Sequence, residues 1–89
     1  NQRTYFMELR IEQHREALSA AFGDKPIRGF ENMLQAMMTA YEAIGFKRGR
    51  NVMVKLLQYL TDTLKLVIKR DKLFYYDMTQ AETMLFDEE

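Results

Sequence analysis

Apolar side chains, joined by one histidine, recur at alternating intervals of three and four residues in three consecutive blocks of this chain. Residues with this spacing lie on one face of an α-helix, so each block must bury a stripe against a neighbouring element. The pattern therefore predicts three amphipathic helices. The blocks consist of Met7, Ile11, His14, Leu18 and Ala21; Ile27, Phe30, Leu34, Met37, Tyr41 and Ile44; and Met53, Leu57, Leu60, Leu64 and Val67.

The first two predicted helices are bounded by residues that commonly begin and end helices. Thr4 is expected to cap a helix over residues 5–22, and Gly23 is expected to end it in a left-handed conformation. Asp24 is expected to cap a second helix, which extends to Ile44. Because the connection between the two helices is short, they are expected to pack antiparallel.

The last third of the chain is expected to continue the helical pattern. A third helix is predicted over residues 52–70, with Asn51 as its N-cap. Residues 73–76 fit either a short strand or the opening of a helix. A short fourth helix is then expected to follow, capped by either Asp77 or Thr79.

These elements together predict an all-α fold, a compact antiparallel helical bundle with three long helices and a shorter C-terminal fourth. The length of 89 residues corresponds to one domain, residues 1–89. A three-helix core with a strand-like appendage is the structural alternative. The chain contains no cysteine, so no disulfide bond can stabilise it and its apolar core must suffice.

The sequence contains none of the residue patterns that would indicate an enzyme. His14 is the only histidine, and its place in the first apolar block predicts a buried structural role. Glu8, Glu12 and Glu16 share one helix ridge, but none has the histidine three residues later that a di-metal bundle uses. We therefore expect a non-enzymatic protein with no catalytic residue, no cofactor and no metal.

Methionine is abundant, and its placement favours a protein-binding role. Flexible thioether side chains fill irregular cores, and they also line adaptable binding grooves. The predicted second helix is apolar on more than one face, which indicates either a central helix or a docking surface. The sequence thus favours a protein–protein interaction or regulatory domain of the adaptor, anti-activator or inhibitor type. Its predicted partner-binding residues are Met33, Met37, Met38, Phe46, Tyr75 and Tyr76.

Charge is unevenly distributed along a chain that is neutral overall. Residues 1–46 carry five basic and six acidic side chains. Residues 47–72 carry eight basic and two acidic side chains, and residues 73–89 carry five acidic side chains and no basic one. The net charges are therefore −1, +6 and −5. Clustered lysine and arginine supply the salt-dependent part of nucleic-acid affinity. The alternative function is thus a small nucleic-acid-binding module, with phosphate contacts from Lys47, Arg48, Arg50, Lys55, Lys69, Arg70 and Lys72.

These patterns also indicate the partners and the setting of the chain. Another protein is the favoured partner, nucleic acid is the second, and a homodimer would supplement a small core. No apolar run approaches the roughly 20 residues that cross a bilayer, so no membrane partner is expected. The start of the chain leads directly into a predicted amphipathic helix and does not resemble a signal peptide, so a cytoplasmic location is the expectation.

Overall fold

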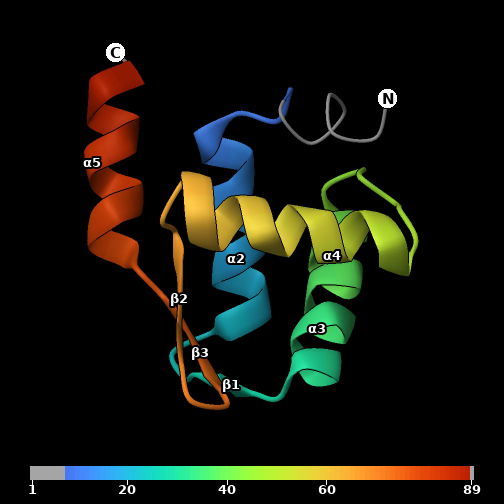
Figure 1. Ribbon diagram of the computed structural model, residues 1–89. Coiled ribbons are helices and arrows are strands. Elements are labelled where there is room, and N and C mark those ends of the chain that lie inside the picture. Colours follow the sequence, from blue (N-terminus) through green and yellow to red (C-terminus); the bar gives the residue numbers. More distant parts are fainter. Residues whose placement is uncertain (1–7, 89) are drawn as a thin grey trace.

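The computed structural model describes residues 8–88 (Figure 1). The helices pack against one face of a small sheet, which consists of a short strand and a β-hairpin that follows much later in the chain. Thr4, the predicted first cap, lies outside the described residues. The elements in chain order are α2 (Ile11–Phe22), β1 (Ile27–Arg28), α3 (Phe30–Ala43), α4 (Arg50–Gln58), the π-helical turn η1 (Tyr59–Thr63), β2 (Val67–Arg70), β3 (Leu73–Tyr76) and α5 (Met78–Glu88).

The prediction of an all-α bundle is wrong, because the protein combines helices with a three-stranded antiparallel sheet. The strand order is β1-β3-β2, so β3 lies in the centre. Ile27 of β1 pairs with Phe74 of β3, and Lys69 of β2 pairs with the same residue from the other side. Residues 73–76, which fitted a strand or a helix in the sequence, are therefore a strand.

The third predicted helix ends earlier than expected, and this difference creates the hairpin. Helical structure stops at Thr63, and Lys65 then adopts a left-handed backbone with φ of 59°. Val67 and the residue after it are β-branched, which favours an extended chain over a helix. Asp71 has φ of 56° within the two-residue turn that joins β2 to β3, the kind of turn that a tight hairpin requires.

The second predicted helix begins later than expected, at Phe30 rather than after Asp24. Ile27 and Arg28 instead form β1, since they pair with β3. Gly29 follows at the N-cap position of α3 with φ of 90°, a conformation that L side chains rarely adopt. The first predicted helix does end at Gly23, as expected.

The hydrophobic core lies between the helices and one face of the sheet. In a strand, alternate side chains point to opposite faces, so Val67, Phe74 and Tyr76 share the inner face. Tyr76 stacks on Phe22 of α2, with 5.9 Å between the ring centroids. The largest side chains without exposed surface are Tyr41, Leu18, Met33, Leu34, Met37, Met53, Leu56, Leu60, Leu66, His14 and Val67.

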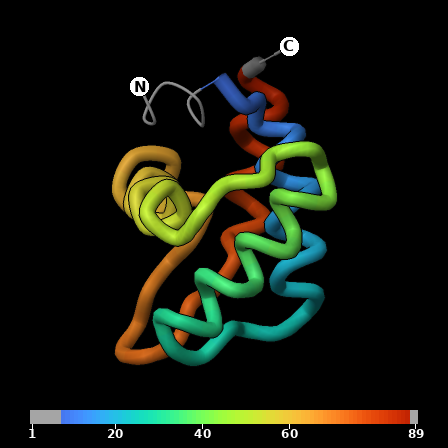
Figure 2. The backbone as a smooth tube through the Cα atoms, turned by 90° about the vertical axis from the view of Figure 1, so that its right-hand side faces the viewer, coloured from blue at the N-terminus to red at the C-terminus, as the bar shows by residue number. Residues whose placement is uncertain are grey.

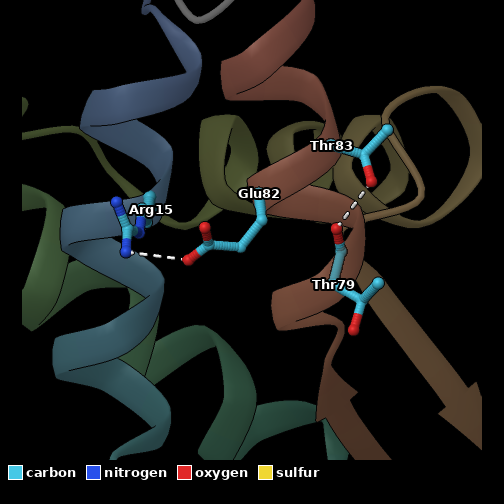
Figure 3. A network of polar contacts seen from close by, with 4 residues as sticks. All are labelled: Arg15, Thr79, Glu82 and Thr83. Carbon is cyan, nitrogen blue, oxygen red and sulfur yellow. Dashed lines mark hydrogen bonds and ion pairs between the residues drawn. The ribbon is translucent and has the colours of Figure 1, made fainter.

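The C-terminal helix α5 packs against α2 at one side of the molecule (Figure 1). The side chain of Asp77 accepts a hydrogen bond from the backbone N–H of Gln80 at 3.0 Å, so Asp77 caps this helix. Ala81 is buried in the contact with α2. Figure 3 shows the exposed ion pair between Arg15 of α2 and Glu82 of α5, whose atoms lie 2.9 Å apart.

Candidate nucleic-acid interface

The outer face of α4 and η1 carries a stripe of polar side chains. Asn51, Lys55, Gln58 and Asp62 are exposed, and their spacing of four, three and four residues places them on one face. The opposite face of α4 is apolar and packs into the core. Hence α4 is fixed to the body of the protein while its polar stripe faces solvent.

Helices α3 and α4 form a crossed pair joined by residues 44–49. Figure 2 looks nearly along the axis of α4, whereas α3 runs across the same view. In Figure 1, α4 lies across the front of α2 and α3, with the hairpin descending from its C-terminal end. The outer face of α4, the second helix of this crossed pair, is thereby presented on the surface.

The β2–β3 hairpin brings together three of the predicted phosphate-binding residues. Lys69 and Arg70 belong to β2, and Lys72 lies in the turn that follows. Arg28 of β1 and Arg70 of β2 pair with the same residue of β3. Because neighbouring strands lie about 4.8 Å apart, these two arginines emerge from the same sheet face with their backbones about 10 Å apart. Both side chains are exposed.

Three other predicted phosphate-binding residues already contact groups of this chain. Lys47 forms an exposed ion pair with Glu42 at 3.8 Å. The guanidinium of Arg48 lies 4.3 Å from the centroid of the Phe46 ring. Arg50 donates a hydrogen bond to Glu31, and this bond lowers the pKa of the Glu31 carboxyl. Lys47 and Arg48 lie in the connection before α4, and Arg50 is the first residue of that helix. Lys55, the seventh predicted residue, belongs to the polar stripe of α4.

The predicted partner-binding residues do not form one exposed face. Met33 and Met37 have no exposed surface, and only 6% of the surface of Phe46 is exposed to solvent. Met38 is half-buried and packs against the core. Tyr76 is half-buried too, so Tyr75, at 38%, is the most exposed residue of this set. The methionines of α3 are therefore mainly core side chains.

A groove of about 530 Å³ runs between η1 and β2. Its apolar lining includes Phe30, Leu57 and Phe74, and two lysines, Lys65 and Lys69, also line it. Phe30 is 42% exposed although it is a large aromatic residue. The sequence did not predict this groove, because its two walls meet only once β2 departs from the helical path.

Asn51, Gln58 and Arg28 are candidate site residues that were not predicted from the sequence. The spacing of Asn51, Lys55 and Gln58 opposite the apolar block was a readable signal for an exposed polar stripe. No local signal could have placed Arg28 beside Arg70, because their proximity depends on the central strand β3.

Two kinds of feature are absent from the part of the chain that the structure describes: clusters of metal-ligating side chains and helices that could span a membrane. Residues 8–88 contain no group of three or more histidine, cysteine, aspartate or glutamate side chains that could hold a metal ion. None of the helices in this range is both long enough and apolar enough to cross a bilayer.

Comparison with known proteins identifies no relative of this chain. No protein-family model, no curated protein sequence and no solved structure matches it. Any functional assignment must therefore come from the residues and their geometry.

Proposed function

We propose that this protein is a non-enzymatic, cytoplasmic nucleic-acid-binding domain that inserts α4 into the major groove of duplex DNA. One observation carries the proposal: the polar stripe of α4 and the cationic hairpin belong to elements that lie next to each other on the surface. An exposed helix fits the major groove, which is about 12 Å wide. The hairpin would then contact the adjacent phosphate backbone.

The residue types of the polar stripe suit the reading of base edges. Asn51 and Gln58 carry amides, which can form two hydrogen bonds to adenine in the major groove. Lys55 carries an ammonium group, which can bind the acceptor atoms of guanine. The stripe therefore combines three side chains that read sequence with a buried apolar face that holds their helix in place.

The hairpin supplies the complementary, sequence-independent contacts. Lys69, Arg70 and Lys72 belong to it, and Arg28 of β1 lies on the same sheet face as Arg70, with β3 between them. Asp71 is the one carboxylate within the turn. Contacts of lysine and arginine with phosphates set the register of a protein on DNA. This local excess of positive charge is compatible with an overall neutral chain, because the compensating acidic residues lie elsewhere.

The order of elements supports the same class of protein by analogy. A helix, a short strand, a crossed helix pair and a β-hairpin, with strand order β1-β3-β2, resemble the arrangement of winged helix-turn-helix domains. The connection in residues 44–49 is longer than the usual three to four residues of the turn. Fold analogy alone does not establish function, so the exposed side chains must carry the proposal.

Binding to a fluorescein-labelled duplex of about 20 base pairs, followed by anisotropy at about 50 and 200 mM salt, tests the proposal. With about four phosphate contacts, we expect affinity to fall on the order of 100-fold over this range. Arg70→Ala and Lys72→Ala should each reduce the salt slope by about one. Gln58→Ala should weaken discrimination between sequences by about 1–3 kcal/mol.

Lys25→Ala is the matched control, because Lys25 is an exposed cation in the turn before β1, away from α4. This variant should bind the duplex as the unaltered protein does. Absence of binding at 50 mM salt would refute the proposal. Binding that Lys25→Ala weakens as much as Arg70→Ala would show non-specific charge attraction without the proposed interface.

Protein binding is the second candidate function, and the observation that favours it is the groove rather than the methionines. Phe30 exposes a large aromatic surface at this groove, and apolar surface of this kind is often covered by a partner. We therefore place a protein-docking surface along β2 and not on α3.

A further inference from the structure

We propose that the groove between η1 and β2 binds an extended, acidic peptide segment of a partner protein, which pairs with β2 as a fourth strand of the sheet. This inference does not depend on nucleic-acid binding. It rests on the unpaired edge of β2, the path of the groove along that edge and the charge of the groove.

The first observation concerns backbone groups. Within residues 8–88, β2 pairs only with β3, so no strand occupies its other edge. Arg70 and Leu73 flank the two-residue turn and form the closing hydrogen-bonded pair of the hairpin. Hydrogen-bonded and non-hydrogen-bonded pairs alternate, so the N–H and C=O groups of Lys69 point away from β3. Those of Val67 do the same, but Val67 is only 1% exposed, so of these two residues only Lys69 offers its backbone groups to a partner.

The second observation concerns the path of the groove. Val67, Ile68 and Lys69 are consecutive in β2, and all three line it. Val67, Lys69 and Phe74 share the inner face of the sheet, so the groove lies on that side of the hairpin. Because Ile68 lines it as well, the groove also reaches the backbone of β2, beside which an added strand would lie.

The dimensions of the groove suit a short peptide. The four residues of β2 extend over about 13 Å at 3.3 Å per residue, which corresponds to four or five residues of a partner strand. Phe30 and Leu57 supply apolar surface opposite this edge. Alternate side chains of an added strand would point toward that surface, whereas the intervening ones would face solvent.

The charge of the groove indicates an acidic partner. Lys65 and Lys69 line it, and the Lys69 ammonium lies 5.9 Å from the centroid of the Phe74 ring. Asp62 is the one carboxylate among the lining residues. Arg50 and Glu31, near Phe30, form an ion pair and add no net charge. An extended segment that alternates apolar and acidic residues therefore complements the groove.

The probe for this inference is the blocked hexapeptide acetyl-Val-Glu-Val-Glu-Val-Glu-amide, titrated into ¹⁵N-labelled protein. We expect the amide signals of Val67 and Lys69 to shift together with those of η1. Lys69→Glu should weaken peptide binding about tenfold, the effect of about 1.4 kcal/mol. Lys25→Glu makes the same charge change beyond β1 and should leave the affinity within about twofold.

Two further peptides separate strand pairing from simple attraction of charges. A version N-methylated at every residue keeps the charge but lacks the backbone donors of all six residues, and we expect it not to bind. A version with lysine in place of glutamate should not bind either. Equal binding of the N-methylated peptide, or shifts that lie outside the groove, would overturn the proposal.

The peptide proposal would also be overturned if a second copy of this chain or a phosphate-bearing ligand occupied the groove, and the same experiment identifies both. Concentration-dependent broadening of Val67 and Lys69 without peptide, and no further shift when peptide is added, would show that a second copy of this chain occupies the edge. Shifts of these amides with a thymidine oligonucleotide, but not with any peptide, would identify the groove as a phosphate site. Duplex-binding experiments are not needed for either outcome, so this inference and the proposed DNA interface can fail separately.

Discussion

At the scale of single residues, His14 is a fully buried polar side chain on α2. Its Nδ1 atom lies 2.8 Å from the hydroxyl oxygen of Tyr41, which joins α2 to α3 inside the core. Burial lowers the pKa of His14 from 6.5 to about 4, and burial also raises the pKa of Tyr41. Both side chains are therefore neutral at pH 7, and they can share one hydrogen bond without burying a charge.

We predict that this histidine makes the fold sensitive to mild acid. Between pH 6.5 and 4 the unfolded chain binds a proton at His14 and the folded protein does not, so stability falls as the pH is lowered. The shift corresponds to about 3 kcal/mol, lost progressively across this range. Urea unfolding at a series of pH values from 7.5 to 4 would measure the loss.

The control for this prediction is the double variant His14→Phe with Tyr41→Phe, which removes both partners of the buried hydrogen bond. Its stability should change much less over the same pH range, because no imidazole remains to titrate. An equal loss of stability in the double variant would assign the acid sensitivity to the carboxylates instead.

The same residues show what sequence alone could predict at this scale. The position of His14 in the first apolar block predicted burial, and the structure confirms it. Its partner Tyr41 was also predicted to lie on an apolar helix face, but their contact depends on how α2 and α3 are rotated against each other. Spacing along one helix carries no information about that rotation.

At the scale of elements, the two residues that the sequence offers as caps of α5 should differ in how much their substitution changes stability. Asp77→Ala should lower the free energy of unfolding by about 1 kcal/mol, because it removes the side-chain acceptor for the N–H of Gln80. Thr79→Ala should change stability by less than about 0.5 kcal/mol, since Thr79 accepts the hydrogen bond from Thr83 through its backbone oxygen (Figure 3).

Chemical denaturation of the two variants, followed by circular dichroism, would check this comparison. Asp77 lies just before α5 and Thr79 within its first turn, so alanine raises helix propensity at Thr79 but not at Asp77, in the same direction as the predicted difference. A larger loss in Thr79→Ala than in Asp77→Ala would contradict the assignment of Asp77 as the cap.

Helix ends with specific chemistry could be predicted, whereas the strands could not. Gly23 ends α2 as expected, since it has φ of 61°. Leu60, Leu64 and Val67 continued the helical spacing, yet the last of them lies in β2. Apolar residues in a buried strand can match helical intervals by coincidence, and the pairing that stabilises β2 comes from β3.

The methionines of α3 illustrate the same limit for the candidate site. A helix that is apolar on several faces can be central or exposed, and sequence does not distinguish these cases. Here α2 and α4 both pack on α3, so Met33 and Met37 are covered. The cations Lys69, Arg70 and Lys72 were predicted as a group, but their neighbour Arg28 required the fold.

At the scale of the whole molecule, charge segregation predicts weak self-association that salt reverses. The basic segment 47–72 and the acidic segment 73–89 have net charges of +6 and −5. Because the net charge of the chain is zero, no overall repulsion keeps copies apart near pH 7. Oppositely charged surfaces of two copies should attract each other at low ionic strength.

Light scattering coupled to size-exclusion chromatography would test this prediction at about 20 and 200 mM salt. We expect a larger apparent mass at the lower value and a monomer at the higher one, because the Debye length falls about threefold. A dimer that persists unchanged at 200 mM salt would contradict an electrostatic origin and indicate an apolar interface instead.

Because β3 is the central strand, the sheet can assemble only late in the synthesis of the chain. Ile27 leaves the ribosome long before its partner Phe74, which follows 47 residues later (74 − 27). Helices α2, α3 and α4 rely on nearer contacts, so they can assemble while the sheet still lacks its middle strand. Until residues 73–76 emerge, the inner faces of β1 and β2 have no strand between them. A nascent chain that stalls after residue 72 thus displays its helices and its basic segment without the strand that joins its two halves.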